Sequence, residues 1–263
     1  MSKLPYSITT IPKGWNLFKL QETASNERYS FTGGPFGSNL KASDYRENGV
    51  RIIQLQNIGD GKFLNNYQIF TSEEKPDELS SCNIFPGDII LSKMGDPVAR
   101  ATFIPEYEDR YVMASDGIRL NVNEEIFDKY FVLSFINSKF FRNNAVKQST
   151  GSTRQRIGLN DLRQLPIIAP PIEEQRAIAD ILGTWDEAIA LTESLISALE
   201  VRKKGLMQKL LTGEVRFSEF DGEWSDVRLG EITEKIQDGN YGASYPKSNE
   251  FLSWYGSSPV PRI

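Results

Sequence analysis

The longest regular pattern in the sequence lies between Pro171 and Leu211. Apolar or small residues recur there at alternating steps of four and three, which is the spacing of a heptad seam on one face of a helix. Thr192 and Lys203 are the two polar interruptions. The apolar positions that we assign to helix pairing are Ile178, Leu182, Trp185, Ile189, Ile196, Leu199, Leu206 and Leu210. The pattern predicts one helix of about 40 residues, or about 60 Å if straight.

Both ends of this predicted helix carry the residues that helix ends favour. Pro171 suits the first turn, and Glu173 and Glu174 complement the positive end of the helix dipole. Gly213 is placed to cap the other end. One interpretation is a core helix of the preceding domain. We favour a helix that packs against another of its kind, because one small domain cannot cover so long a helix.

Shorter apolar segments precede the long helix and predict a mixed domain. β-branched runs and turn residues indicate strands at 50–55, 89–91, 119–122 and 167–168, with a Pro86-Gly87-Asp88 turn before the second. Helical spacing from Asp128 to Asn144 predicts one helix. The predicted fold class is α+β: an α/β-type domain (1–168), a long coiled-coil-forming helix (169–213) and the start of a second, incomplete domain (214–263).

The second domain is predicted from an internal repeat. The chain reads GWNLFKLQE from Gly14 to Glu22 and EWSDVRLGE from Glu223 to Glu231, with tryptophan, leucine and glutamate at one common offset. Such repetition decides the architecture. We interpret the chain as a domain, a helical spacer and the beginning of a second copy of the domain.

Composition excludes several kinds of chemistry. The chain has no histidine and a single cysteine, Cys82. Ser-His-Asp and Cys-His catalysis and structural zinc sites are therefore excluded, and no disulfide can form within the chain. Cys82 is expected to pack in the core. A lone cysteine suits a reducing cytoplasm, and the N-terminus lacks the apolar centre of a signal peptide. No apolar run is long enough to span a membrane.

Basic residues cluster locally although the net charge is −5. Six Lys and Arg residues accompany one acid between 139 and 163, and five accompany one acid between 202 and 216. Charges are screened over about 8 Å at physiological salt, so local clusters matter more than the total. Nucleic acid therefore stays open as a partner.

The chain resembles the DNA-specificity subunits of type I restriction–modification systems. The segments that carry the resemblance are PKGW with KLQE, FTGGPFGSNL, YRENGVRIIQLQNIGDG, FPGDIILSKMGDPVARATFIP, STGSTRQRIGLNDLRQLPIIAPPIEEQRAIADIL and KKGLMQKLLTGEVRF. QDGNYGASYPKSNEF resembles text that opens a repeat in this family. The resemblance covers the chain up to about Glu250.

The resemblance implies a division of labour. Such subunits read a bipartite site on double-stranded DNA with two target-recognition domains, which two antiparallel helices separate. They have no catalytic role, no metal site and no cofactor of their own. Methyltransferase subunits would supply adenine methylation with S-adenosylmethionine, and a restriction/translocase subunit would use ATP and Mg²⁺.

The chain departs from the family where the second domain breaks off, in FLSWYGSSPVPRI. Two chains could restore two-site recognition, because pairing of two antiparallel helices would place identical domains at opposite ends. We therefore expect a homodimer and a palindromic target with a fixed spacer.

Three loops combine glycine or serine with side chains that hydrogen-bond to DNA. The first offers Ser38, Asn39 and Lys41, and the second Ser92, Lys93 and Arg100. The third, which we favour, offers Lys147, Gln148, Ser149, Ser152, Thr153, Arg154, Gln155 and Arg156. An ordinary solvated loop is the alternative for the third, and a structural turn is the preferred interpretation of Gly33-Gly34.

Two other functions remain as alternatives. One is a coiled-coil adaptor that docks enzymes and no longer binds DNA. The other is a nuclease, for which the only support is Glu73 and Lys75 in an E-x-K spacing. Such short matches are common, and this one falls in a predicted surface loop. No P-loop or methyltransferase signature occurs in the sequence.

Overall fold

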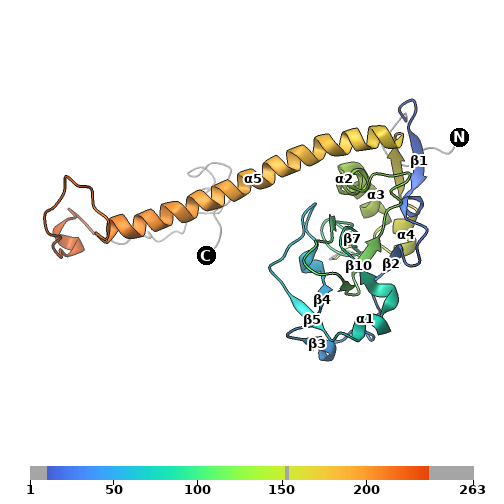
Figure 1. Cartoon of the computed structure of the whole chain (residues 1–263), viewed down its shortest axis with the longest axis horizontal. Helices are drawn as coiled ribbons and strands as arrows, with labels where there is room; N and C mark the ends of the chain where they lie inside the picture. The colour runs from blue at the N-terminus through green and yellow to red at the C-terminus, as the bar shows by residue number, and fades with distance from the viewer. Residues whose placement is uncertain (1–10, 152–153, 237–263) are drawn as a thin grey trace, which may run out of the picture. The chain divides into compact units, whose positions relative to one another are not determined.

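The computed structural model describes residues 11–151 and 154–236 (Figure 1). Contacts between residues divide the chain into two compact units, Met1–Ser194 and Leu195–Ile263. The long helix α5 (Ile172–Leu211) contributes its first part to one unit and its second part to the other. Strands and helices mix in the first unit, which confirms the predicted α+β class and the long helix that follows.

Three small sheets build the first unit. The largest has the order β3-β5-β4-β9-β6, formed by β3 (Tyr45–Arg46), β5 (Ile69–Thr71), β4 (Val50–Ile53), β9 (Tyr111–Met113) and β6 (Asn83–Ile84). The next has the order β2-β10-β7-β8, formed by β2 (Phe31–Gly33), β10 (Gly117–Leu120), β7 (Ile89–Ser92) and β8 (Ala101–Phe103). The third pairs β1 (Asn16–Lys19) with β11 (Pro166–Ala169). Among the described strands only β4 and β9 pair in parallel.

Four short helices and four 3-10 turns accompany the strands of this unit in the described residues. The helices are α1 (Lys75–Glu78), α2 (Lys129–Asn137), α3 (Lys139–Gln148) and α4 (Leu159–Arg163), and the 3-10 turns are η1 (Leu20–Thr23), η2 (Ala42–Asp44), η3 (Leu55–Asn57) and η4 (Ser80–Cys82). In Figure 1, α2 and α3 lie between the start of α5 and the strands β7 and β10, and the main hydrophobic core joins these elements.

The central strands of the two larger sheets have no polar face, because the core covers them on both sides. All residues of β4, β7 and β10 are buried, so these strands are covered on both sides. Arg119 in β10 is buried with them, and its Nε lies 2.7 Å from Oδ2 of the equally buried Asp88. A buried charge requires such a partner. Cys82 packs in a smaller apolar cluster, as predicted.

Most predicted elements exist, but their ends differ. Strands β7 and β11 match the predictions at 89–91 and 167–168. The first predicted strand ends at Ile53, because the 3-10 turn η3 begins at Leu55. The strand predicted at 119–122 is β10, which begins and ends two residues earlier, and Val122 forms only an isolated bridge with Ala24.

The prediction of one helix from Asp128 to Asn144 is wrong. Ser138 has extended backbone angles, with φ −67° and ψ 150°, and separates α2 from α3. The Ser138 Oγ accepts a hydrogen bond from the backbone N–H of Phe141, at 3.3 Å. A serine that caps the next turn in this way competes with the continuing helix. The apolar residues keep a helical spacing on both sides of Ser138, so their pattern does not reveal the break.

Gly33-Gly34 has a structural role, but it is not the predicted turn. Gly33 is the last residue of β2, and the N–H of Gly34 donates to the carbonyl of Gly117 at 2.8 Å. A Cβ at Gly34 would lie 1.8 Å from the carbonyl oxygen of Ala114. The glycine is needed because two backbone segments approach closely.

The second unit contains the rest of α5 and a chain segment whose described part includes η5 (Leu229–Glu231). Gly213 follows α5 with a φ of +74°, which agrees with the predicted cap. None of the helices in the described part of the chain has the length and apolar character needed to cross a bilayer.

The two copies of the internal repeat share a local backbone motif. In the first copy the N–H of Lys19 donates to Oε2 of Glu22 at 2.6 Å, directly before η1. In the second the N–H of Arg228 donates to Oε2 of Glu231 at 3.1 Å, directly before η5. Their burial differs, because Leu20 is fully buried whereas Leu229 is 63% exposed. The second domain as a whole stays a prediction, since residues 237–263 lie outside the described residues.

Candidate nucleic-acid interface

Two of the three predicted loops lie side by side in the structure. One follows β7, and the other connects α3 to α4. The N–H of Gly95 donates to the carbonyl of Gln155 at 3.3 Å, and the N–H of Ile157 donates to the carbonyl of Lys93 at 2.9 Å. An isolated β-bridge joins Met94 to Arg156. These backbone contacts make the two loops one surface.

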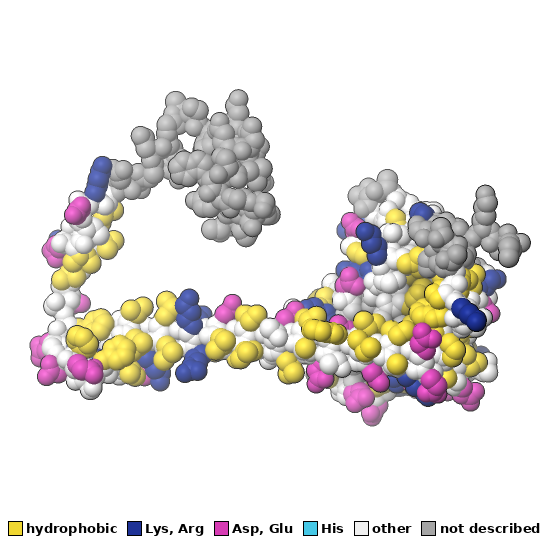
Figure 2. Space-filling model, turned by 90° about the horizontal axis from the view of Figure 1, so that it is seen from above, with side chains coloured by type: hydrophobic (Ala, Val, Ile, Leu, Met, Phe, Trp, Pro, Cys, Tyr) yellow, Lys and Arg dark blue, Asp and Glu magenta, His cyan; other side chains and the backbone are white. Residues whose placement is uncertain are grey.

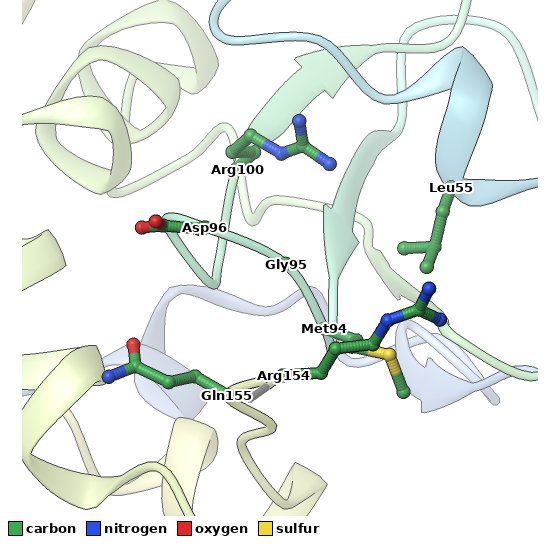
Figure 3. A pocket seen from close by; sticks show the side chains of 7 residues that line it. All are labelled: Leu55, Met94, Gly95, Asp96, Arg100, Arg154 and Gln155. Carbon is green, nitrogen blue, oxygen red and sulfur yellow. The ribbon is translucent and has the colours of Figure 1, made fainter. Parts of the chain in front are cut away.

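A pocket of about 390 Å³ opens between these loops and η3 (Figure 3). Arg154 points toward Leu55 in Figure 3, and Arg100 has its guanidinium on the same side of the pocket. The carboxylate of Asp96 points away from both. The lining residues are Leu55, Met94, Gly95, Asp96, Arg100, Arg154 and Gln155.

The loop after β7 turns back sharply to place Arg100 in this pocket. Gly95 has a φ of +137° and Ala99 a φ of +58°, and positive values are uncommon for residues other than glycine. Ser92 fastens the returning chain: its carbonyl accepts from the N–H of Ala99 at 3.0 Å, and its Oγ accepts from the N–H of Arg100 at 3.0 Å. Backbone conformations of this kind gather at functional sites.

Arg100 and Arg154 line the pocket without a carboxylate partner among the described residues. The Nε of Arg100 is buried without a hydrogen-bond acceptor in the described structure. Four other arginines of the domain are paired with acids, namely Arg110 with Asp77, Arg119 with Asp88, Arg142 with Asp60 and Arg156 with Asp116. Others contact backbone carbonyls or an aromatic ring instead: Arg28, Arg46, Arg51 and Arg163. The pocket thus offers two guanidinium groups to an outside acceptor.

The charge of Arg100 also acts on Arg142, which is paired with Asp60. Burial lowers the pKa of Arg142, and the charge of Arg100 lowers it further, whereas Asp60 opposes both effects. The NH2 of Arg142 lies 2.6 Å from Oδ1 of Asp60. A bound anion near Arg100 would relieve this repulsion.

Three residues that the sequence predicts to contact DNA use their polar groups for contacts within the two loops or with neighbouring segments. Ser92 is fully buried, so its assignment as a DNA contact is wrong. Lys93 is partly buried and donates from Nζ to the carbonyl of Ser115 at 3.0 Å. Its pKa is lowered, mainly by burial and then by Arg156. Arg156 remains half exposed, but its NH2 lies 2.7 Å from Oδ1 of Asp116.

The remaining residues of the third loop are placed less uniformly. Lys147 is exposed at the end of α3. The Oγ of Ser149 donates to the carbonyl of Val146 at 2.6 Å, so this hydroxyl already has an intramolecular acceptor. Ser152 and Thr153 lie outside the described residues.

The first predicted loop lines a separate pocket of about 400 Å³, and none of its lining residues belongs to the pocket of Arg100. Ser38, Asn39 and Lys41 are exposed, and the Oγ of Ser38 donates to Oδ1 of Asn39 at 3.2 Å. Asp44 and Glu78 also line this pocket. These carboxylates make it a less favourable place for a phosphate.

Sequence reasoning missed the apolar and acidic members of the arginine pocket: Leu55, Met94 and Asp96. Met94 and Asp96 lie in a loop whose polar and basic side chains alone indicate DNA contact. The sequence predicts Leu55 at the end of a strand, whereas it lies in η3. No sequence signal placed it near Arg154, because only the tertiary fold brings the two together.

Helix α5 carries the second surface of interest. Figure 2 shows hydrophobic side chains spread along it. Trp185, Ile189, Ile196, Leu199 and Leu206 are between 48% and 68% exposed. Beyond Ser194, a groove of about 460 Å³ is lined by Leu199, Arg202, Lys203, Leu206, Met207, Leu210 and Leu211.

The first residues of the predicted seam contact the domain that precedes the helix. Ile178 is partly buried and packs against the main core of the first unit, so part of its surface is already covered within the chain. Leu182, which is 39% exposed, lines a pocket with Tyr130 and Asp186. The open part of the seam therefore begins at about Trp185.

Two features of a metal-dependent nuclease can be checked in the described residues: a metal-binding cluster and the E-x-K match. No group of three or more acidic or cysteine side chains that could hold a metal ion occurs in the described part of the chain. Lys75 of the E-x-K match is paired with Glu78, at 2.8 Å, rather than with Glu73.

The described chain is an α+β domain that continues into a forty-residue helix, and this fold is similar to that of a solved HsdS subunit. Residues 12–201 match the family described as type I restriction modification DNA specificity domain, and the chain belongs to this family. Specificity subunits are the non-catalytic components of these systems, in which the activities reside in other subunits.

Individual relatives agree with this assignment. The type I restriction enzyme MjaVIII specificity subunit of Methanocaldococcus jannaschii is 26% identical over 213 residues, which are 80% of this chain and 48% of the relative. The HsdS subunit of Thermoanaerobacter tengcongensis has a similar structure, with a TM-score of 0.52 and 19% identity over 85% of this chain and 54% of that one.

A further similar chain comes from a study of complex assembly and conformational transition in a type I restriction–modification system. Its TM-score is 0.55, with 20% identity over 78% of this chain and 46% of that one. At this identity the likeness shows the fold alone. The chain spans about half the length of the relatives that it matches.

Proposed function

We propose that the chain is the DNA-reading subunit of a type I restriction–modification complex and binds double-stranded DNA through the arginine pocket and the loops around it. The observation that carries this proposal is the pair of guanidinium groups, Arg100 and Arg154, which have no acidic partner within the described residues. Arginine reads guanine through two hydrogen bonds and also contacts phosphates. Lys147 and Gln155 would add contacts around the pocket, and Ser38, Asn39 and Lys41 of the first loop would contact DNA outside it.

We propose further that two copies pair through α5. The exposed apolar row from Trp185 onward favours this arrangement, because side chains of this size are normally covered. Two copies paired in this way would bring two reading domains into one assembly. Antiparallel pairing would relate them by a two-fold axis, and the target would then be a palindrome with a gap.

In this proposal the chemistry belongs to partners. Methyltransferase subunits would dock along α5 and methylate adenine with S-adenosylmethionine. A restriction/translocase subunit would cleave DNA with ATP and Mg²⁺. The complex would work in the cytoplasm, where its DNA target lies.

Sequencing of modified bases in DNA from cells that express this chain with a cognate methyltransferase subunit tests the proposal. A palindromic, gapped methyladenine motif is expected. Complete absence of a motif, with the two subunits still copurifying, would overturn DNA reading and favour the docking adaptor. Cleavage of DNA by the isolated chain would instead favour the nuclease.

A further inference from the structure

The first part of α5 is fastened to the reading domain by directional polar contacts, which begin at Gln175. This side chain is 2% exposed. Its Oε1 accepts from the N–H of Asp128 at 3.0 Å, and its Nε2 donates to the carbonyls of Ile126 at 3.2 Å and Pro170 at 2.9 Å. A single amide thus ties the start of α5 to the start of α2.

Asp128 makes the attachment rigid on its own side. It is the N-cap of α2, and its Oδ1 accepts from the N–H of Phe131 at 2.8 Å. The ring of Phe131 packs edge-on against Trp15, with 6.4 Å between centroids, and Nε1 of Trp15 donates to Oε1 of Glu174 at 3.2 Å. Trp15, directly before β1, therefore contacts both α2 and α5.

A second anchor lies three turns further along α5. The hydroxyl of Tyr130 donates to Oδ2 of Asp186. Burial, together with this carboxylate, raises the pKa of Tyr130 to about 12, so the hydroxyl keeps its proton at neutral pH. The ring of Tyr130 also lies against Gly183, where an added Cβ would be 3.8 Å from Cζ.

Between the two anchors the helix is held by packing. Ala179 is 6% exposed, and both Ile178 and Ala179 belong to the main core. One more contact follows at Glu193, whose Oε2 lies 3.4 Å from Nζ of Lys62. Both of these side chains are well exposed, so this ion pair adds little.

We propose that Gln175 and the Tyr130–Asp186 pair form a joint that fixes the angle between the reading domain and the spacer helix and thereby selects the gap in the DNA site. Gln175 and Tyr130 act as positioning residues and need not contact DNA themselves. This inference rests on the proposed function for its link to the gap. The fixed angle itself does not depend on DNA.

The length of α5 determines how far its distal end would move if one anchor were lost. The anchors are 11 residues apart in sequence, which is about 16 Å along a helix. A displacement of about 1 Å at the second anchor becomes about 3 Å at the end of the helix, because α5 is about three times as long as the distance between the anchors. One base-pair step of DNA rises by about 3.4 Å. Loss of one anchor is therefore enough to admit gaps one base pair longer or shorter.

The angle can be measured directly on the full chain. Spin labels on Glu27→Cys and Glu200→Cys, in a Cys82→Ala background and diluted with unlabelled chain, report the distance from the domain to the helix. We expect Tyr130→Phe to broaden this distance distribution at least twofold. Tyr67→Phe is the matched control, because no described residue bonds to the Tyr67 hydroxyl. A distribution as narrow as that of the control overturns the joint.

Modified-base sequencing with the same variants links the joint to the gap. For Tyr130→Phe we expect unchanged half-site bases, at least threefold less methylation at the native gap, and new methylation at gaps altered by one base pair. Methylation confined to the native gap at the wild-type level overturns the inference. If the wild-type chain itself gives no gapped motif, the proposed function and the selection of a gap fail together, while the spin-label distances still decide whether the joint fixes the angle.

Discussion

Charging the open seam of α5 should separate two paired chains. Leu199 and Leu206 are 50% and 48% exposed, and both line the groove on the second part of α5. Seven residues at 100° each place them about 20° apart around the helix, hence on one face. We therefore choose Leu199→Glu combined with Leu206→Glu as the perturbation.

The magnitude follows from the leucine surface that pairing would cover. Complete burial of a leucine side chain stabilises by about 1.5–3 kcal/mol, so covering the exposed half contributes about 1 kcal/mol. Two leucines in each of two chains give about 4 kcal/mol, or about a thousandfold in the dissociation constant. Desolvation of the introduced carboxylates adds several kcal/mol more. A dimer of nanomolar affinity would become monomeric at micromolar concentration.

Sedimentation equilibrium measures this change directly. The wild-type chain is expected at the mass of two copies and the double variant at the mass of one, with unchanged near-ultraviolet circular dichroism. Val201→Glu is the matched control, because Val201 is 70% exposed and lies about 200° from Leu199 around the helix. An unchanged dimer mass in the double variant, or dissociation of the control to the same extent, would refute the assigned seam.

Three further predictions test the reading domain. Arg100→Ala with Arg154→Ala should lower the slope of log binding constant against log salt by about 2, since each lost phosphate contact removes about 0.9; binding with the wild-type slope would show that the pocket is not on DNA. Gly34→Ala should destabilise the fold by more than about 3 kcal/mol in chemical denaturation, because the added Cβ would lie 1.8 Å from a backbone carbonyl oxygen. The control Gly37→Ala has open space around its Cβ and should change stability by less than about 1 kcal/mol, so equal losses would contradict the packing argument. Because the raised pKa of Tyr130 stabilises the protonated form, its contribution to stability is complete below pH 10 and is lost as pH rises toward 12; unfolding midpoints should fall more steeply there in wild type than in Tyr130→Phe, and identical pH profiles would count against the hydrogen bond.

Local patterns were sufficient for some elements and insufficient for others. The forty-residue helix has enough turns for its heptad spacing to exceed chance, and β7 and β11 are apolar runs bounded by turn residues. Strands of two or three residues, such as β3, β6 and β9, are too short to show any period. The break at Ser138 was missed because apolar spacing passes unchanged from α2 into α3.

The sequence by itself determined the family, the long helix and the two loops that carry arginine. Only the tertiary structure decided which of their side chains are available. Ser92 lies in a loop that the sequence predicts to contact DNA, yet it is fully buried. Ile178 belongs to the predicted pairing seam, yet it packs in part against the core of its own domain. Arg100 and Arg154 share a pocket with Leu55 because backbone hydrogen bonds join two loops more than fifty residues apart. Exposure and proximity depend on long-range packing, which no local pattern of residue types records.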